Sequence, residues 1–238
     1  MNRFSFERRI ARAEELAAIY PFAKEILLFY QQVLMFQSSV QPGDFAATVP
    51  RLLTLVEETG TPQLVQASRD LCSKGIEYWN RFLDDFWRSR QSEIESEAFF
   101  AKVLLQPYAE LQTQHTPDAG SLCPVCGGKP VASVLRPEGH GAKRSLLCSM
   151  CSTEWSFPRV VCPACGEQSF EKLPVHKADE FAHMRVDCCD SCRTYVKTVD
   201  LATNGLAVPQ VDEIATIPLD LWAREQGYVK LELNLFGL

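Results

Sequence analysis

The stretch CPVCG at 123–127 opens the region that decides the fold, and LCSMC at 147–151, CPACG at 162–166 and CDSC at 189–192 follow it. Each segment holds one Cys-x-x-Cys pair, a turn that points two thiolates at one place while its backbone N–H groups face the sulfurs. Two such turns complete a tetrahedron of ligands around zinc or iron, so four pairs predict two tetrathiolate metal sites. The predicted ligands are Cys123, Cys126, Cys148, Cys151, Cys162, Cys165, Cys189 and Cys192.

The four pairs form an internal repeat. Twenty-one residues separate the first pair from the second, and 23 separate the third from the fourth. The segment CPVCG of the first unit also matches CPACG of the second. Matching spacings predict two similar modules in tandem, so we expect the first two pairs to bind one ion and the last two pairs to bind another.

Paired cysteines have two other common uses, and both fit this chain less well. Disulfides belong to secreted proteins, but no secretory signal peptide opens the sequence, and a partner separated by only two residues is a poor cross-link. A thioredoxin-type redox pair needs one Cys-x-x-Cys near a βαβ pattern, which this region lacks. We therefore expect a cytoplasmic protein, in which reduced thiols are free to bind metal.

Two cysteines fall outside the repeat. Cys72 lies in a helical apolar pattern, so we expect it to be buried as a small hydrophobe. Cys188 precedes a predicted ligand in an extended segment, and adjacent residues of such a segment point in opposite directions, so it should point away from the metal. Eight thiolates already satisfy two four-coordinate ions, so the nearby histidines should be surface groups or lie behind the ligands. These histidines are His140, His176 and His183.

The first half of the chain has a helical pattern. Apolar residues recur there at spacings of three and four, and its aromatic residues should fill a helical core. Turn signals separate the helices: Asp44 should cap one, Thr61 precedes Pro62 at the start of another, and Ser92 or Ser96 should cap a last helix reaching Leu111.

Short predicted strands replace the helices after residue 119. Each metal module has only about forty residues, so metal binding should supply much of its folding free energy. A final helix is expected over 215–228. We predict an α+β protein in four parts. These are an all-α domain over 1–115, rubredoxin-like (zinc-ribbon) modules over 119–160 and 161–202, and a C-terminal tail with a helix over 203–238.

Charge and motifs exclude several functions. The metal region 119–200 has ten Lys or Arg against nine Asp or Glu, and the whole chain carries a net charge of −6, which disfavours binding to nucleic acid. The longest apolar run, 26–36, is too short to span a membrane. No nucleophile triad, phosphate loop or carboxylate pair stands out, and closed tetrathiolate sites leave no position for a substrate. We therefore expect no enzyme.

The order of the motifs resembles one family. LLCSMCSTEW (146–155), VVCPACGEQ (160–168) and VDCCDSCRTYVKTVDL (186–201), after CPVCG and behind a helical half, are similar to the formate dehydrogenase accessory protein family, FdhE. The most specific pieces are Cys-x-x-Cys-x-Thr-Glu-Trp at 148–155 and Cys-x-x-Cys-x-Thr-Tyr-x-Lys at 189–197. Generic zinc ribbons do not share them.

The resemblance implies a cytoplasmic bacterial protein whose two rubredoxin-like modules each hold iron through four cysteines. Family members are required for maturation of respiratory formate dehydrogenases and contact the catalytic subunit. Zinc in place of iron and assembly into a homo-oligomer both stay open. Two other functions remain: a rubredoxin-like electron carrier, and a structural zinc-ribbon protein that binds protein or nucleic acid.

Overall fold

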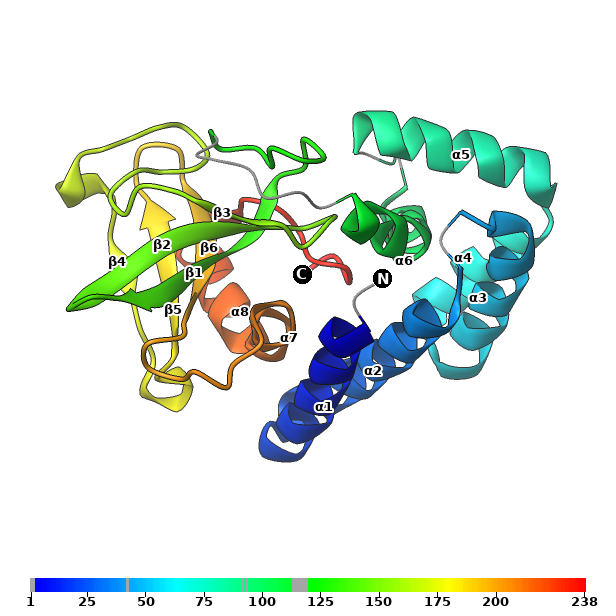
Figure 1. The fold of residues 1–238 in the computed structure, drawn as a ribbon, viewed down its shortest axis with the longest axis horizontal. Helices are drawn as coiled ribbons and strands as arrows, with labels where there is room; N and C mark the ends of the chain where they lie inside the picture. The colour runs from blue at the N-terminus through cyan, green and yellow to red at the C-terminus, as the bar shows by residue number, and fades with distance from the viewer. Residues whose placement is uncertain (1–2, 42, 91, 93, 113–119) are drawn as a thin grey trace.

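The computed structural model describes residues 3–41, 43–90, 92, 94–112 and 120–238 (Figure 1). Its first half is helical, as predicted, and no helix among the described residues could span a membrane. The elements of this half are α1 (Arg3–Ile19), η1 (Pro21–Ala23), α2 (Lys24–Ser39), α3 (Phe45–Thr59), α4 (Pro62–Cys72), α5 (Gly75–Ser89) and α6 (Glu95–Leu111).

Side-chain caps fix the starts of α3 and α4. Asp44 accepts a hydrogen bond from the backbone N–H of Ala47, and Thr61 accepts one from that of Leu64. Pro62 occupies the first turn of α4, where its missing N–H has no helical partner to lose. These two predictions are confirmed.

The predicted cap of α6 is wrong. The helix begins at Glu95 with Ile94 as its N-cap, and Ile94 has no side chain that can accept a hydrogen bond. The Ser92 hydroxyl instead bonds the backbone of Ile94, accepting from its N–H and donating to its C=O. Ser92 therefore forms a local turn before the helix.

The second half is a mixed sheet of seven strands in the order β3-β2-β1-β6-β5-β4, with β7 paired to β6. The β1–β6 and β6–β7 pairings are parallel and the others antiparallel. The strands are β1 (Pro130–Glu138), β2 (Gly141–Cys148), β3 (Glu154–Ser156), β4 (Val175–His176), β5 (Met184–Cys189), β6 (Thr194–Asp200) and β7 (Val229–Lys230). Two short turns of 3-10 helix, η2 (Phe170–Lys172) and η3 (Asp179–Phe181), flank β4.

This topology joins the two repeat units in one sheet. The first unit contributes β1 to β3 and the second contributes β4 to β6, and the parallel pairing of β1 with β6 brings them together. The sequence repeat predicted two modules in tandem, whereas the strands show that they also share backbone hydrogen bonds. The α+β fold itself is confirmed.

The C-terminal segment has two short helices where the sequence predicted one. They are α7 (Pro209–Ala215) and α8 (Ile217–Glu225), and they meet at Thr216. Pro218 lies in the first turn of α8, which explains why a new helix starts here. In Figure 1 the last residues of the chain run between the helical half and the sheet.

One apolar core extends across the helical half, the sheet and the C-terminal helix α7. It contains buried side chains from the N-terminal helices, from β2 and β3, and from α7. Examples are Leu27, Val103, Leu146, Trp155 and Val211, each at most 2% exposed. A second core lies between the sheet and α8 and includes Val134, Val186 and Ala223.

Candidate metal centres

The first cysteine group consists of Cys123, Cys126, Cys148 and Cys151, whose sulfurs all lie within 4.8 Å of one another. The Sγ–Sγ distance is 3.4 Å between Cys123 and Cys151, and also between Cys126 and Cys148. A tetrahedral ion with metal–sulfur bonds of about 2.3 Å places its sulfurs about 3.8 Å apart. The four thiols are therefore close to the spacing that a metal requires.

The second cysteine group consists of Cys162, Cys165, Cys189 and Cys192. Its Sγ–Sγ distance is 3.7 Å both between Cys162 and Cys192 and between Cys165 and Cys189. Each repeat unit thus gathers its own four cysteines, as the spacing predicted. A crossed arrangement, with the first turn paired to the third, does not occur.

All four Cys-x-x-Cys turns have the same backbone conformation. The fourth residue after the first cysteine of each turn has a positive φ, between 54° and 77°. The N–H groups of Gly127, Gly166 and Arg193 donate to the carbonyl of the first cysteine of their turn at 2.8–2.9 Å. The four residues are Gly127, Ser152, Gly166 and Arg193.

The residue type at this position differs between the turns. Glycine adopts a positive φ at little cost, so the glycine that ends each CPxCG segment is a sequence signal for this turn conformation. Ser152 and Arg193 hold the same conformation against the usual preference of a side-chain-bearing residue, a penalty of about 1–2 kcal/mol. No sequence signal predicts these two left-handed residues.

Backbone and side-chain groups approach the sulfurs closely. The N–H of Met150 lies 3.3 Å from Cys148 Sγ, and the N–H of Ala164 lies 3.4 Å from Cys162 Sγ. Such N–H···S contacts stabilise the thiolate form that a metal needs. The Cys151 thiol donates to Thr153 Oγ1 at 3.0 Å, so Thr153 of the Thr-Glu-Trp signature orients a predicted ligand.

The thiol pKa values connect metal binding to pH. Burial raises the pKa of Cys162 to about 12, and the hydrogen bonds that it accepts from its own turn do not compensate. Burial also raises the pKa of Cys192, but hydrogen bonds with Thr194 outweigh this effect and lower it to about 7. An incoming ion would therefore displace protons, as thiolate ligation requires.

The two groups differ in exposure. In the first group Cys123, Cys148 and Cys151 are 3%, 2% and 0% exposed, and all three belong to the core that includes the helices. In the second group Cys165 is exposed and Cys192 is half-buried.

The helical half also contacts the first group directly. The Arg90 guanidinium donates to the carbonyl of Cys126 at 2.9 Å and stacks on Trp87 at 3.9 Å. Gln106 of α6 donates to the carbonyl of Ser149, between Cys148 and Cys151, at 3.1 Å. The end of α5 and one side of α6 thus hold both turns of this group.

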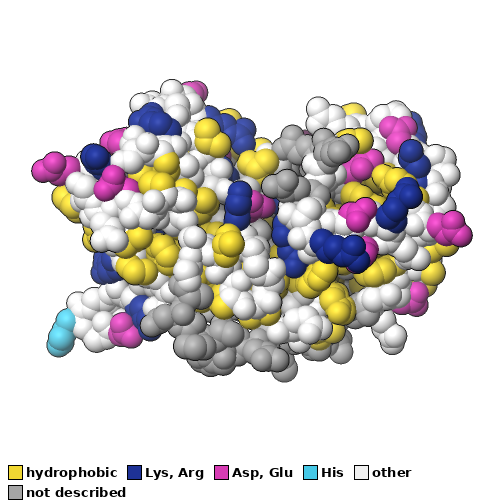
Figure 2. All heavy atoms as spheres, turned by 90° about the horizontal axis from the view of Figure 1, so that it is seen from above, with side chains coloured by type: hydrophobic (Ala, Val, Ile, Leu, Met, Phe, Trp, Pro, Cys, Tyr) yellow, Lys and Arg dark blue, Asp and Glu magenta, His cyan; other side chains and the backbone are white. Residues whose placement is uncertain are grey.

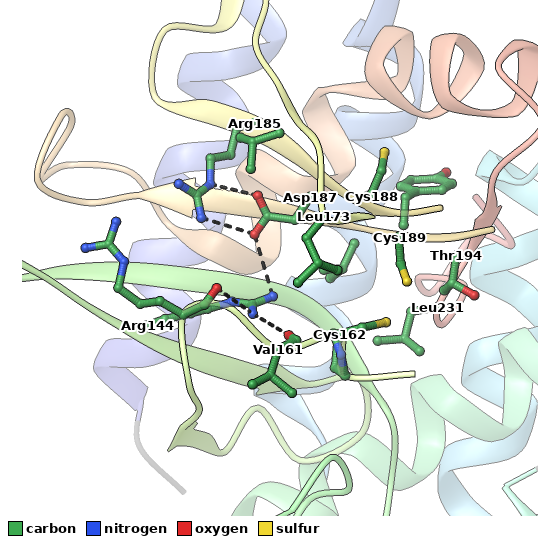
Figure 3. A pocket seen from close by; sticks show the side chains of 15 residues that line it. Arg144, Val161, Cys162, Leu173, Arg185, Asp187, Cys188, Cys189, Thr194 and Leu231 are labelled. Carbon is green, nitrogen blue, oxygen red and sulfur yellow. Dashed lines mark hydrogen bonds and ion pairs between the residues drawn. The ribbon is translucent and has the colours of Figure 1, made fainter. Parts of the chain in front are cut away.

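The two cysteines outside the repeat behave differently. Cys188 is buried in the second core, and Figure 3 shows its side chain on the opposite side of β5 from that of Cys189, as predicted. Cys72 is exposed at the end of α4, so the prediction that it is buried is wrong. The apolar stripe of α4 ends at the buried Leu71, and Cys72 has turned off that stripe.

A small cavity of about 50 Å³ lies beside the second group (Figure 3). Cys162 and Cys189 line it together with four charged side chains, those of Arg144, Arg159, Arg185 and Asp187. Asp187 forms an ion pair with Arg185 at 2.8 Å and accepts a hydrogen bond from Thr198, and Arg144 lies 3.6 Å away. Asp187 is the one carboxylate among three arginines, and Arg144 and Arg159 also donate to backbone carbonyls of the surrounding chain, so the cavity is part of the packing around the group.

None of the three histidines near the cysteines belongs to either group. His183 is buried, with Nε2 2.8 Å from an oxygen of Asp212, and the ring of His176 packs at a tilt against Trp222, with ring centroids 4.6 Å apart. His140 is exposed in the turn between β1 and β2. The linker histidine, His115, lies outside the described residues.

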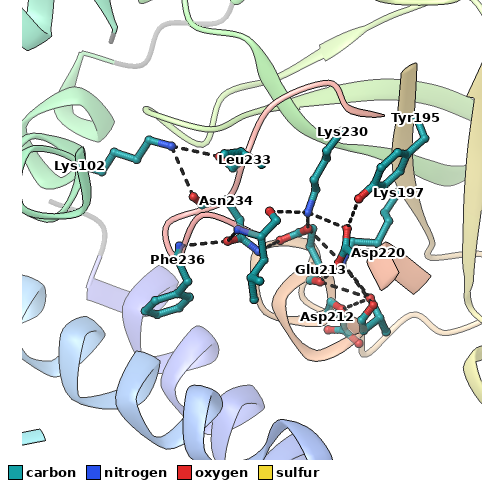
Figure 4. A network of polar contacts seen from close by, with 12 residues as sticks. Lys102, Tyr195, Lys197, Asp212, Glu213, Asp220, Lys230, Leu233, Asn234 and Phe236 are labelled. Atoms are coloured by element: carbon teal, nitrogen blue, oxygen red, sulfur yellow. Dashed lines mark hydrogen bonds and ion pairs between the residues drawn. The ribbon is translucent and has the colours of Figure 1, made fainter. Parts of the chain in front are cut away.

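The second signature leads to a network that sequence reasoning missed (Figure 4). Tyr195 donates to Asp220 at 2.8 Å, and Lys197 forms ion pairs with Glu213 at 3.0 Å and with Asp220 at 2.5 Å. Lys230 pairs with the same two carboxylates, and all four charged groups have side chains at most 2% exposed. Thr-Tyr-x-Lys thus anchors α7 and α8 to the sheet. The one signal in the sequence was the presence of acidic residues, Glu213 and Asp220 among them, in a largely apolar helical stretch.

Family models match the part of the chain that carries both groups. The model described as FdhE, central domain, matches residues 122–159, and FdhE, C-terminal domain, matches residues 160–236. A protein named FdhE homolog from Aquifex aeolicus is 34% identical over 192 residues, which cover 78% of this chain and 68% of that protein. This chain belongs to the FdhE family.

Other FdhE proteins match to different extents. An FdhE homolog from Haemophilus influenzae is 36% identical over 115 residues, which are 48% of this chain but only 37% of that protein. The crystal structure of the FdhE protein from Pseudomonas aeruginosa has the same fold, with a TM-score of 0.75 over 99% of this chain and 96% of that one, at 22% identity. The family resemblance expected from the cysteine motifs is confirmed, and the fold shared with this structure includes the helical half.

Proposed function

We propose that this FdhE homolog is a metal-binding accessory protein for the maturation of respiratory formate dehydrogenase, acting in the cytoplasm on the catalytic subunit of that enzyme. The two cysteine groups within an FdhE-family chain carry the proposal. Each group supplies four thiols at the spacing of a tetrahedral ion, so each would hold one ion. We assign no reaction to the chain itself, because four thiolates leave no open coordination position for a substrate.

Iron is the ion that we propose for the cell. An iron tetrathiolate exchanges one electron, whereas zinc has no redox chemistry. The protein's part is to hold the four sulfurs, direct backbone N–H groups at them and control how far water reaches them. Visible absorption and metal analysis of protein purified without oxygen distinguish the two ions, because ferric tetrathiolate is red and the zinc form is colourless.

A protein partner fits the surface better than nucleic acid does. On the face shown in Figure 2, Lys and Arg side chains alternate with Asp and Glu and form no continuous basic tract. The net charge of −6 works against phosphate binding in addition. A rubredoxin-like electron carrier is the second candidate, and the exposed Cys165 favours it, because an electron carrier needs a ligand near its surface.

A genetic test separates the maturation function from a general effect on folding. A host that lacks its own accessory protein receives either wild-type protein or the Cys123→Ala/Cys126→Ala double variant. We expect the double variant to retain at most one ion and to produce no active formate dehydrogenase, because two remaining thiolates cannot hold the first module. The control is Cys72→Ala, which removes an exposed cysteine outside both groups. Normal formate oxidation with the double variant, at equal protein level, would refute a role for the first group.

A further inference from the structure

The two cysteine groups share one backbone geometry but lie in different surroundings. Apolar residues enclose the first group: Met150 and Trp155 are 3% and 2% exposed and belong to the same core as its buried cysteines. The side chains of Arg90 and Gln106 bond its two turns from the helical half. Cys126 is the one half-buried cysteine of this group, so an ion there would be enclosed on most sides by the sheet and the helices.

The second group has one closed side and one open side. Cys162 and Cys189 are buried at 5% and 1%, but Cys165 is exposed and Cys192 is half-buried. None of these four cysteines belongs to either apolar core. An entering ligand could thus reach two of the four sulfurs without displacing core side chains.

Surface contacts hold the second group's turns together. The half-buried Glu167 follows the first turn, and it accepts a hydrogen bond at 2.6 Å from Ser191 in the second turn. The same carboxylate accepts from the N–H groups of Gln168 and Ser169 and lies 3.6 Å from Lys172. Solvent-exposed contacts of this kind contribute little stability and open easily.

We propose that the second group is an exchangeable metal site, whereas the first is a permanent structural one, an inference that rests on the proposed binding of two ions. Ligand exchange begins when water or a competing ligand reaches the ion, and each departing thiolate then takes up a proton or another cation. At the second group this requires only a local opening around Cys165 and Cys192. At the first group it requires the helices to separate from the sheet. The second ion can therefore leave or enter while the rest of the chain stays folded.

The wild-type chain tests this directly, with zinc as the probe. Full-length protein loaded with two zinc ions is mixed without oxygen with an excess of a chromogenic chelator, and samples are quenched over time with a thiol-alkylating reagent. We expect one ion to leave at least about tenfold faster than the other. Mass spectrometry should find the early alkylation at 162, 165, 189 and 192 and the late alkylation at 123, 126, 148 and 151.

Matched serine variants give the second test. Cys165→Ser and Cys126→Ser replace the same position of the first turn in each group. Cys165→Ser should abolish the fast phase and leave the slow ion and the helical circular dichroism signal unchanged. Cys126→Ser should keep the fast phase and loosen the contacts with α5 and α6.

The possible outcomes distinguish a failure of the exchangeable-site proposal from a failure of the proposed metal binding. Release of both ions in one phase, or early alkylation at the first group, overturns the exchangeable site while leaving metal binding intact. Failure of the wild-type chain to take up two ions overturns metal binding itself and the exchangeable site with it.

Discussion

Gly128 shows how closely the chain approaches the first group. A Cβ added at this position would lie 3.2 Å from Cys148 Sγ and 3.3 Å from Cys126 Sγ. These are sulfurs of two different turns, so Gly128 is the residue that lets the turns close around one point. Its carbonyl also accepts the N–H of Cys123 at 2.8 Å. Any larger residue would push the two turns apart.

We therefore predict that Gly128→Ala weakens metal binding at the first group only. The added methyl group should cost about 1–3 kcal/mol, the usual range for overpacking, which corresponds to roughly a fivefold to 150-fold loss of affinity. Competition with a chelator measures this for each ion. The control is Gly141→Ala, where an added Cβ meets nothing within 4 Å. Equal affinities of Gly128→Ala and Gly141→Ala would show that the close approach is unimportant.

The buried carboxylate of Glu213 links stability to pH. Burial alone raises the pKa of Glu213, but the ammonium groups of Lys197 and Lys230 outweigh it and lower the pKa to about 2, below its ordinary value of 4.5. As the pH falls, the unfolded chain therefore takes up this proton before the folded chain does. The stabilisation from Glu213 is complete above about pH 4.5 and is lost as the pH falls toward 2.

Glu213→Gln should remove this contribution. At neutral pH we expect a loss of about 3–5 kcal/mol in the free energy of unfolding, because two buried ammonium groups then share only Asp220. The difference between wild type and variant should shrink as the pH falls from about 5 toward 2. Denaturant unfolding at a series of pH values measures it, and loss of metal in acid affects both proteins alike. A difference that stays constant down to pH 2 would contradict the assignment.

At the residue scale, the sequence predicted the ligands and not their supports. Eight cysteines in a repeated spacing can be recognised because metal chemistry restricts both residue type and distance. Ser152 and Arg193 have no such signal, because their positive φ follows from the shape of the turn rather than from their side chains. Nothing in the sequence marks Lys197 and Lys230 as partners, and only the fold shows that both are buried between the same two carboxylates.

At the element scale, α1 is joined to α7 by one buried ion pair. The Arg12 guanidinium donates to both oxygens of Asp212, at 3.0 and 2.6 Å, and His183 lies 2.8 Å from the same carboxylate. Burial raises the pKa of Asp212, but His183 and Arg12 outweigh it and hold the pKa below its usual value. Arg12 also contacts Glu15, whose side chain is 52% exposed.

This arrangement offers a matched pair of variants around one guanidinium. Asp212→Ala should lower the free energy of unfolding by about 3–5 kcal/mol, since it leaves Arg12 buried without its main partner. Glu15→Ala should change it by less than about 1 kcal/mol, because solvent screens the exposed pair. Hydrogen exchange of α1 should rise only in Asp212→Ala. Similar effects of the two substitutions would show that burial does not decide the strength of this contact.

Elements were predictable where their signals are local. The cap at Asp44 and the Thr61-Pro62 pair predicted two helix starts correctly, because such signals depend only on the next few residues. The helix expected over 215–228 corresponds to α8, whose start Pro218 marks, whereas the short helix α7 before it was missed. The pairing of β1 with β6 was also beyond the sequence, because it joins strands that lie about sixty residues apart in the chain.

At the scale of the whole molecule, the helical half shares its apolar core with the rest of the chain and is not packed as a separate body. The boundaries at 115, 160 and 202 remain predictions, but the main core contains side chains from the helices, the first module and α7 together. Three polar contacts reinforce it: Arg12 with Asp212, Arg90 with Cys126, and Gln106 with Ser149. The first group is therefore built into the centre of the protein, and its ion would support the helices as well as its own module.

The central claim is that each repeat unit holds one ion through its own four cysteines. X-ray absorption at the metal edge, combined with metal analysis of full-length protein purified without oxygen, tests it most directly. The account predicts two ions per chain, each surrounded by four sulfurs at about 2.3 Å. One ion per chain after metal reconstitution, or a coordination shell containing nitrogen or oxygen, would contradict it.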